Sequence, residues 1–168
     1  MGHGMKLYYT VVETAMGWLL LIGREGTLVE VWPPRPTSRA ARGGVPPAAV
    51  ESADGFGDLP ERLRLYFEGK PVDFSNVEVS FDGLGQFEER VLRQTMKVPY
   101  GKLMSYGALA AAAGSPGAAR AAGNAMRRNP APIVVPCHRV IHADGSIGGY
   151  SGGLDLKRRL LALEGIVL

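Results

Sequence analysis

Apolar residues dominate three runs in the first third of the chain, and short turn sequences separate them. The runs cover residues 6–14, 17–26 and 27–34 and are rich in Val, Tyr, Leu and Trp. These residue types favour strands, and the short connections AMG and REGT suit hairpins. The pattern predicts an antiparallel meander.

The periodicity is lost after the third run. Residues 33–58 are crowded with Pro, Gly, Ala and charged residues, which predicts a long loop or a partly ordered connection. A short helix is predicted over residues 59–70, where Pro60 suits the first turn and a glycine the end. Residues 77–82, VEVSFD, predict one more strand.

The pattern becomes helical from Leu84 onward. Residues 84–98 place apolar side chains on one face, and Pro99 ends that pattern. Two short helices should follow, one capped by Ser105 and ended by glycine, the next starting at Ser115 and Pro116.

The second of these short helices cannot extend past Asn129 and Pro130, so the pair predicts a helix-turn-helix. Residues 142–153 are rich in glycine and predict a loop or small wing. Residues 154–165 predict a final amphipathic helix.

Composition narrows the class of protein. With 46% apolar and 21% charged residues among 168, the chain has the profile of a globular protein, and no apolar run approaches the roughly 20 residues of a membrane span. The start of the chain does not resemble a secretory signal. One cysteine excludes an intramolecular disulfide, and with three histidines a zinc site is not expected. We therefore expect a cytoplasmic protein with no metal, no cofactor and no membrane partner.

Charge is distributed unevenly. Residues 1–83 carry 8 Lys and Arg against 11 Asp and Glu, whereas residues 84–168 carry 11 against 5. A basic half gains by neutralising phosphates, so the second half is a candidate for binding a polyanion. Ordinary variation of surface charge remains open as the other explanation.

The predicted helix over residues 117–128 is unusually slim because most of its side chains are Ala or Gly. Close packing against another helix would explain small residues on one side but not on both. A slim helix that carries Arg120, Arg127 and Arg128 could enter the minor groove of DNA, which is about 6 Å wide. Solvated surface arginines are the alternative interpretation.

The only cysteine, Cys137, lies in the sequence NPAPIVVPCHRVIH. A lone cysteine is most often a buried apolar residue, but a neighbouring His138 or Arg139 would favour the reactive thiolate. Three prolines restrict the approach and would fix the direction of the thiol. In an extended segment His138 would point away from Cys137 and act through a water, with Glu164 as the candidate group that orients it.

Four segments together resemble the O6-alkylguanine-DNA alkyltransferases: VPYGKLMSYGALAAAAG, AARAAGNAMRRNP, IVVPCHRVI and GGYSGGLDLKRRLLALEG. The similarity covers about 80 residues, from Leu84 to Gly165. The first 83 residues are similar only in outline to the ribonuclease-H-like N-terminal domain of that family. The resemblance implies an α+β fold in two domains. Residues 1–83 would form a small antiparallel sheet with a helix, and residues 84–168 a mostly helical, winged helix-turn-helix-like domain.

The resemblance also implies roles for individual residues. Cys137 would be the acceptor nucleophile, activated through water by His138, which Glu164 holds, while Asn129 braces the turn before it and Tyr106 donates a proton toward guanine. Arg120 would replace the extruded nucleotide in the stack. The remaining implied residues either follow the minor groove or line the guanine pocket: Ala119, Ala121, Gly123 and Arg127 for the groove, and Met126, Tyr150 and Ser151 for the pocket.

The implied activity is the irreversible transfer of an alkyl group from O6-alkylguanine in double-stranded DNA to Cys137, once per molecule. Nucleotide flipping would expose the buried carbon. A monomer working in the cytoplasm at the nucleoid is expected. The alternatives are a protein that only binds alkylated guanine, a transcription regulator that uses the helix-turn-helix, and a cysteine hydrolase. The reactive cysteine, the alanine-rich helix and the adjacency of Cys137 to His138 argue against these three in turn.

Overall fold

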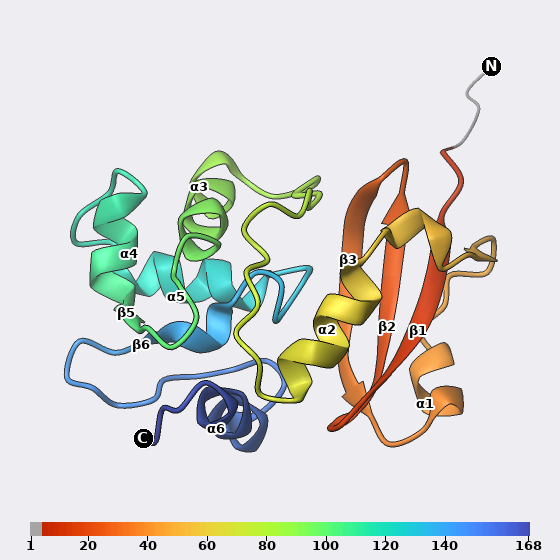
Figure 1. Ribbon diagram of the computed structural model, residues 1–168. Helices are drawn as coiled ribbons and strands as arrows, with labels where there is room; N and C mark the ends of the chain where they lie inside the picture. The colour runs from red at the N-terminus through yellow and green to blue at the C-terminus, as the bar shows by residue number, and fades with distance from the viewer. Residues whose placement is uncertain (1–4) are drawn as a thin grey trace. The chain divides into compact units, whose positions relative to one another are not determined.

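The computed structural model describes residues 5–168, which divide into two compact units (Figure 1). The first unit extends through Val72 and includes Val77–Ser80. The second comprises Asp73–Asn76 and Phe81–Leu168. Within the described residues no helix is both long enough and apolar enough to span a membrane.

A four-stranded sheet forms the centre of the first unit, in the order β3-β2-β1-β4. The predicted antiparallel meander is confirmed by its first three strands. Glu25 and Gly26 both have positive φ, as the two-residue hairpin loop between β2 and β3 requires. The strands are β1 (Tyr8–Thr14), β2 (Gly17–Arg24), β3 (Thr27–Arg35) and β4 (Val50–Glu51), of which β4 pairs parallel to β1.

Strand β2 forms the core of this unit. Four consecutive residues, Leu19 to Ile22, are buried, so both faces of the strand are covered because successive side chains point to opposite faces. Helix α2 (Leu59–Phe67) packs against β1, and helix α1 (Ser38–Arg42) packs against β1, β2 and β3. The predicted helix over residues 59–70 is confirmed.

The prediction of a long loop over residues 33–58 is wrong in part. This stretch contains the end of β3, helix α1, strand β4 and the 3₁₀ turn η1 (Asp54–Phe56). The Thr37 hydroxyl accepts a bond from the Ala40 amide and starts α1, and the Val50 amide donates to the Leu7 carbonyl. Elements this short show no periodicity. Helix α1 depends on this local cap and on packing against the sheet, and β4 depends on its pairing with β1.

The predicted strand over residues 77–82 is also wrong. Its apolar residues Val79 and Phe81 are buried, which explains the alternation in the sequence. Its bridge to the sheet is formed with Leu28, whose amide donates to the Glu78 carbonyl and whose carbonyl accepts from the Ser80 amide, both at 2.8 Å. A single bridge therefore forms in place of a strand.

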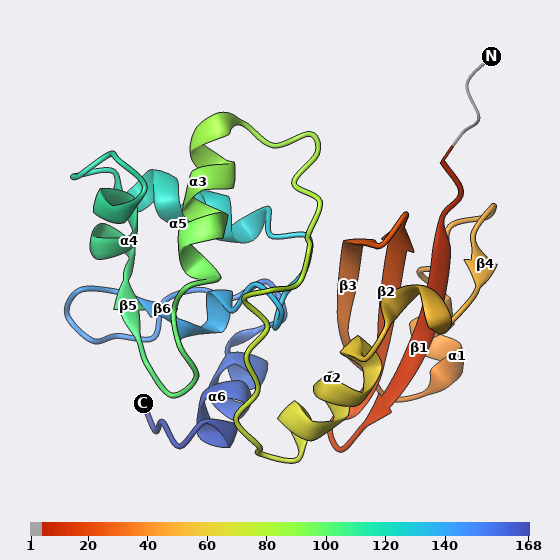
Figure 2. The ribbon, with the colours of Figure 1, turned by 45° about the horizontal axis from the view of Figure 1, so that its top comes forward.

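Three helices of the second unit pack against one another in pairs, as the two views of the ribbon show (Figure 2). They are α3 (Gln86–Thr95), α4 (Tyr106–Ala112) and α5 (Ala119–Arg127). The Ser105 hydroxyl caps α4 as predicted, by accepting a 3.1 Å bond from the Ala108 amide. The predicted helix pair α4 and α5 is confirmed.

The start predicted for α5 at Ser115 and Pro116 is wrong. The helix begins at Ala119, and no side chain caps it. The Ser115 amide donates to the Ala110 carbonyl, so Ser115 closes the end of α4. Gly117 has a φ of 86°, which a helix cannot accept.

A two-residue parallel ladder, which the sequence did not predict, positions the segment that contains Cys137. Strand β5 (Met104–Ser105) pairs with β6 (Val140–Ile141) and places the first residue of α4 beside the segment that contains Cys137. Helix α6 (Leu154–Leu163) packs on the 3₁₀ turn η2 (Cys137–Arg139). Residues 142–153 carry no helix or strand, in agreement with the predicted loop.

Candidate active site

The segment around the cysteine is buried at every position from 131 to 141. The Asn129 side chain fixes its entry, because its amide donates to the Val135 carbonyl at 2.9 Å and its oxygen accepts from the Ala131 amide at 3.0 Å. Ile133 has a φ of 79°, which is costly for a β-branched residue. The segment is therefore a tightly bonded, strained turn.

The sequence suggested an extended segment for Cys137 and His138, but the structure does not have one there. They form the 3₁₀ turn η2, in which the Cys137 amide donates to the Val135 carbonyl and the Arg139 amide to the Pro136 carbonyl. The turn gives the two side chains different surroundings. Cys137 lines a pocket, whereas His138 is fully buried and does not belong to the lining.

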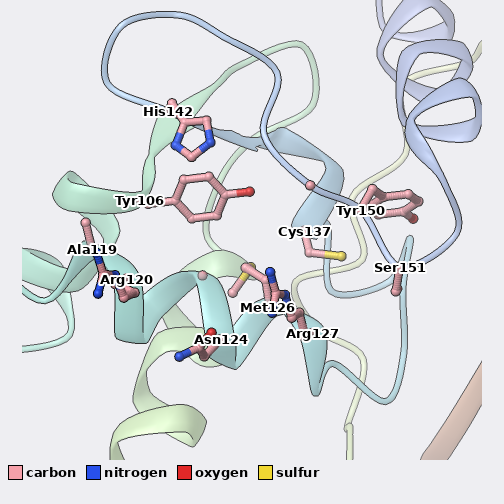
Figure 3. Close-up of a pocket in the computed structure, with 12 residues that line it drawn as sticks. Tyr106, Ala119, Arg120, Asn124, Met126, Arg127, Cys137, His142, Tyr150 and Ser151 are labelled. Carbon is pink, nitrogen blue, oxygen red and sulfur yellow. The ribbon is translucent and has the colours of Figure 1, made fainter.

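The pocket has a volume of about 770 Å³, within the range of small-ligand sites (Figure 3). Helix α5 forms one wall, and the sulfur of Cys137 points into the space near Tyr150. Most residues proposed from the sequence for DNA and base binding line it: Tyr106, Ala119, Arg120, Gly123, Met126, Arg127, Tyr150 and Ser151. Ala121 is exposed on α5 outside this lining, and Asn129, His138 and Glu164 lie outside it as well.

Cys137 is only 5% exposed. Burial raises its pKa above the ordinary value, while a hydrogen bond from Asn129 and the charge of Lys157 act in the opposite direction. The thiol therefore keeps its proton at neutral pH, and a nucleophilic reaction at this sulfur requires a base.

The nearest base in sequence, His138, is held by a carboxylate. Its Nε2 lies 2.6 Å from Oε2 of Glu164, and both side chains are fully buried. Burial lowers the pKa of His138, although Glu164 raises it. A neutral imidazole at pH 7 can accept a proton.

Arg139 does not supply charge to the thiol, contrary to one sequence interpretation. Its Nε donates to Oε1 of Glu164 at 2.8 Å, and its Nη1 donates to the Val98 carbonyl at 2.7 Å. The buried cation at the thiol is Lys157, which the sequence analysis missed. Its Nζ donates to three carbonyls, those of Val140, Ile147 and Gly149.

Tyr106 forms the wall of the pocket opposite α5, with its ring 5.1 Å from the ring of His142 (Figure 3). Burial raises its pKa, so the hydroxyl keeps its proton and can donate a hydrogen bond. Gly148, which the sequence analysis also missed, has a φ of 72°, and a Cβ there would lie 2.7 Å from the Tyr106 hydroxyl. Position 148 therefore requires a glycine, because the backbone there passes so close to the Tyr106 side chain.

The exposed face of α5 combines small and cationic residues. Arg120, Ala121, Asn124 and Arg127 are exposed along it, whereas the opposite face is buried among the helices. Asn124 belongs to the pocket wall and was not anticipated from the sequence. Arg128 forms an ion pair with Glu88 at 2.8 Å. It is therefore a weaker candidate for binding DNA than Arg120 and Arg127.

The remaining pocket residues differ in burial. Met126 is 8% exposed and contacts Thr95 of α3. The hydroxyl of Tyr150 is buried without a hydrogen-bond partner among the described residues, and burial raises its pKa well above the ordinary value. Ser151 is exposed. No cluster of three or more His, Cys, Asp or Glu suited to a metal occurs in residues 5–168.

Comparisons with known proteins agree along most of the chain. Residues 86–166 match the family model of the 6-O-methylguanine DNA methyltransferase, DNA binding domain, and residues 7–81 match its ribonuclease-like domain. A methylated-DNA–protein-cysteine methyltransferase of Mycolicibacterium paratuberculosis is 42% identical over 93% of this chain and 91% of its own. One from Methanosarcina acetivorans is 38% identical over 95% and 99%.

Solved structures give the same result. The Mycobacterium tuberculosis OGT in complex with DNA has a TM-score of 0.77 and 37% identity, covering 94% of this chain and 92% of that one. The O6-methylguanine-DNA methyltransferase of Pyrococcus kodakaraensis has a TM-score of 0.69 and 29% identity, covering 95% and 99%. The chain belongs to the methylated-DNA–protein-cysteine methyltransferase family.

Proposed function

We propose that this protein repairs DNA by moving an alkyl group from O6 of guanine in a duplex to Sγ of Cys137. One observation carries the proposal: the only cysteine of the chain lines a pocket large enough to hold a nucleobase, between Tyr106 and the exposed arginines of α5. The relatives named above, including one solved with DNA, support it.

The reaction is a displacement at the alkyl carbon. The thiol proton passes through a water to His138, the sulfur forms a bond to the carbon, and the carbon–O6 bond breaks. The guanine leaves with its electron pair, and the hydroxyls of Tyr106 and Ser151 donate hydrogen bonds to it. The product is a thioether that no group in the pocket can cleave, so each molecule reacts once.

The alkyl carbon lies inside the duplex, so the nucleotide must leave the stack. Extrusion costs a few kcal/mol, less at a damaged pair. Arg120 enters the vacated position, while Ala119, Ala121 and Gly123 allow α5 to approach the minor groove and Arg127 contacts the backbone. Tyr150 and Met126 enclose the base. The protein acts as a monomer in the cytoplasm, at the nucleoid.

Mass spectrometry tests the transfer. Incubation with a duplex bearing one O6-methylguanine should add at most one methyl group to each protein molecule. Peptide mapping should locate this group at Cys137. Cys137→Ser should abolish the transfer and keep binding to the duplex. Several turnovers per molecule, or restored guanine beside an unmodified cysteine, would disprove the proposal.

Arg120→Ala tests the flipping step separately. The variant should transfer methyl from the duplex at least tenfold more slowly, yet react with free O6-alkylguanine base at nearly the normal rate, since the free base needs no extrusion. Arg158→Ala, which removes an exposed arginine of α6, is the control. Equal slowing on both substrates would show that Arg120 has no role in nucleotide flipping.

A further inference from the structure

The carboxylate of Glu164 has three donors around it. His138 Nε2 lies 2.6 Å from Oε2, and Oε1 accepts two bonds of 2.8 Å, one from Arg139 Nε and one from the Gly101 amide. Gly101 has a φ of 75°, a conformation that L side chains rarely adopt. The two oxygens are thus divided, with one facing the histidine and the other facing Arg139 and the backbone.

Arg139 connects three segments of the second unit at this point. It lies in η2 beside His138, its Nη1 bonds the Val98 carbonyl, and its guanidinium lies 5.8 Å from the centre of the Tyr100 ring. The Tyr100 hydroxyl in turn donates to the Leu163 carbonyl at the end of α6. These contacts hold the arginine over Glu164 and prevent it from turning toward the pocket.

The charges explain why a cation is needed there. A buried carboxylate with a histidine as its only partner would draw a proton onto the imidazole, because a buried charge requires a counter-charge. Arg139 supplies that charge permanently, since a guanidinium stays protonated. Burial has the largest effect on His138 and lowers its pKa. Glu164 raises this pKa, and the charges of Arg139 and Lys157 lower it.

We propose that Arg139 is a positioning residue for the transfer reaction: it neutralises Glu164, so that His138 rests as the neutral tautomer with Nε2–H donated to Glu164. The other ring nitrogen, Nδ1, is then the acceptor for the thiol proton of Cys137. When the proton arrives, Glu164 stabilises the imidazolium. This inference rests on the proposed function for its role, but the state of the ring can be measured without DNA.

Nitrogen-15 NMR of the histidine rings tests the inference directly, because the chain has only three histidines. In the unmodified protein the His138 signals should show the neutral Nε2–H form and a titration midpoint below the ordinary 6.5. In Arg139→Met the midpoint should move to at least one pH unit above 6.5, because the guanidinium that bonds Oε1 of Glu164 is then absent. Arg139→Lys should restore a low midpoint, and Arg158→Met should leave it unchanged.

Two results would overturn the inference. A midpoint in Arg139→Met that equals that of the unmodified protein, or that settles at 6.5, would mean that the arginine only packs. If Arg139→Met does not fold, the double variant with Glu164→Gln decides: recovery of the fold supports the charge role, and failure of both contradicts it. Absence of methyl transfer in the unmodified protein would instead refute the proposed function and leave the ring titration valid.

Discussion

Gly148 and Gly149 are neighbours in the sequence but have different surroundings. A Cβ on Gly148 would lie 2.7 Å from the Tyr106 hydroxyl and would sit on a backbone with a φ of 72°, whereas a Cβ on Gly149 would meet nothing within 4 Å. The first glycine is therefore required by the pocket wall, and the second is not.

This difference predicts unequal effects of alanine. Gly148→Ala should lower the free energy of unfolding by about 1–2 kcal/mol, through left-handed strain and the collision with Tyr106. It should also slow methyl transfer by roughly tenfold, because a displaced hydroxyl stabilises the leaving guanine less well. Gly149→Ala should stay within about 0.5 kcal/mol and keep its rate. Denaturant titration and single-turnover kinetics would check both, and equal losses would contradict the assignment.

Lys157 predicts a dependence of stability on pH. Burial lowers its pKa from 10.5 to about 8 in the folded protein. Between these values the unfolded chain binds more protons than the folded one, so the contribution of this lysine to the free energy of unfolding rises with pH from about 8 to 10.5.

The measurement is the pH dependence of unfolding for two proteins. The difference between the unmodified protein and Lys157→Met should grow by about 3 kcal/mol or less across that range. The raised pKa of Cys137 acts in the opposite direction in both proteins, so it largely cancels in the difference. A difference that stays flat from pH 8 to 10.5 would show that Lys157 titrates as an ordinary lysine.

At the scale of elements, two serines precede the helices of the predicted pair, but only one of them caps a helix. Ser105 accepts a bond from the Ala108 amide at the start of α4, whereas α5 starts at Ala119 without a side-chain cap. Ser105→Ala should therefore cost about 1 kcal/mol of unfolding free energy, and Ser115→Ala less than about 0.5 kcal/mol. Thermal unfolding of the two variants would check this, and a larger loss at Ser115 would restore the cap that the sequence suggested.

The same pair shows what the sequence can predict about elements. Long periodic runs and capped helices were predicted correctly, among them β1 to β3, α2, α3 and α6, because their local preferences agree with the fold. The strands β4, β5 and β6 were missed because each depends on pairing with a distant segment, and α1 was missed because five residues are too few to show a periodicity. The start of α5 was misplaced because Gly117 adopts a positive φ that no sequence pattern reveals.

The candidate site divides in a similar way. The resemblance of four segments to the alkyltransferase family identified most of the residues that line the pocket, because those segments keep the order and spacing of the family. The partners of Arg139, the three carbonyls at Lys157 and the approach of Gly148 to Tyr106 depend on contacts across 8 to 42 positions. No local pattern carries that information.

At the scale of the whole molecule, binding to DNA should weaken steeply with salt, because neutralising phosphates releases counterions. Residues 84–168 carry six more cationic than anionic side chains, and α5 exposes Arg120 and Arg127. Binding of Cys137→Ser protein to a duplex should fall linearly on a plot of log K against log salt. Titrations at several salt concentrations would give the slope.

Single arginines should change that slope by different amounts. In the same Cys137→Ser background, Arg127→Ala should reduce its magnitude by about 0.9, the value of one lost phosphate contact. Arg128→Ala should reduce it less, because Glu88 already neutralises that side chain. Equal reductions would mean that the ion pair opens on DNA.

The single, buried sulfhydryl also allows the unreacted fraction of this protein to be measured directly. No second cysteine competes for a thiol label, so a bulky maleimide added after denaturation attaches at one position only. Molecules that have accepted an alkyl group cannot take the label, and the two populations separate by mass on a gel. The labelled fraction then reports how much of the protein remains unspent in any mixture, without isotopes or antibodies.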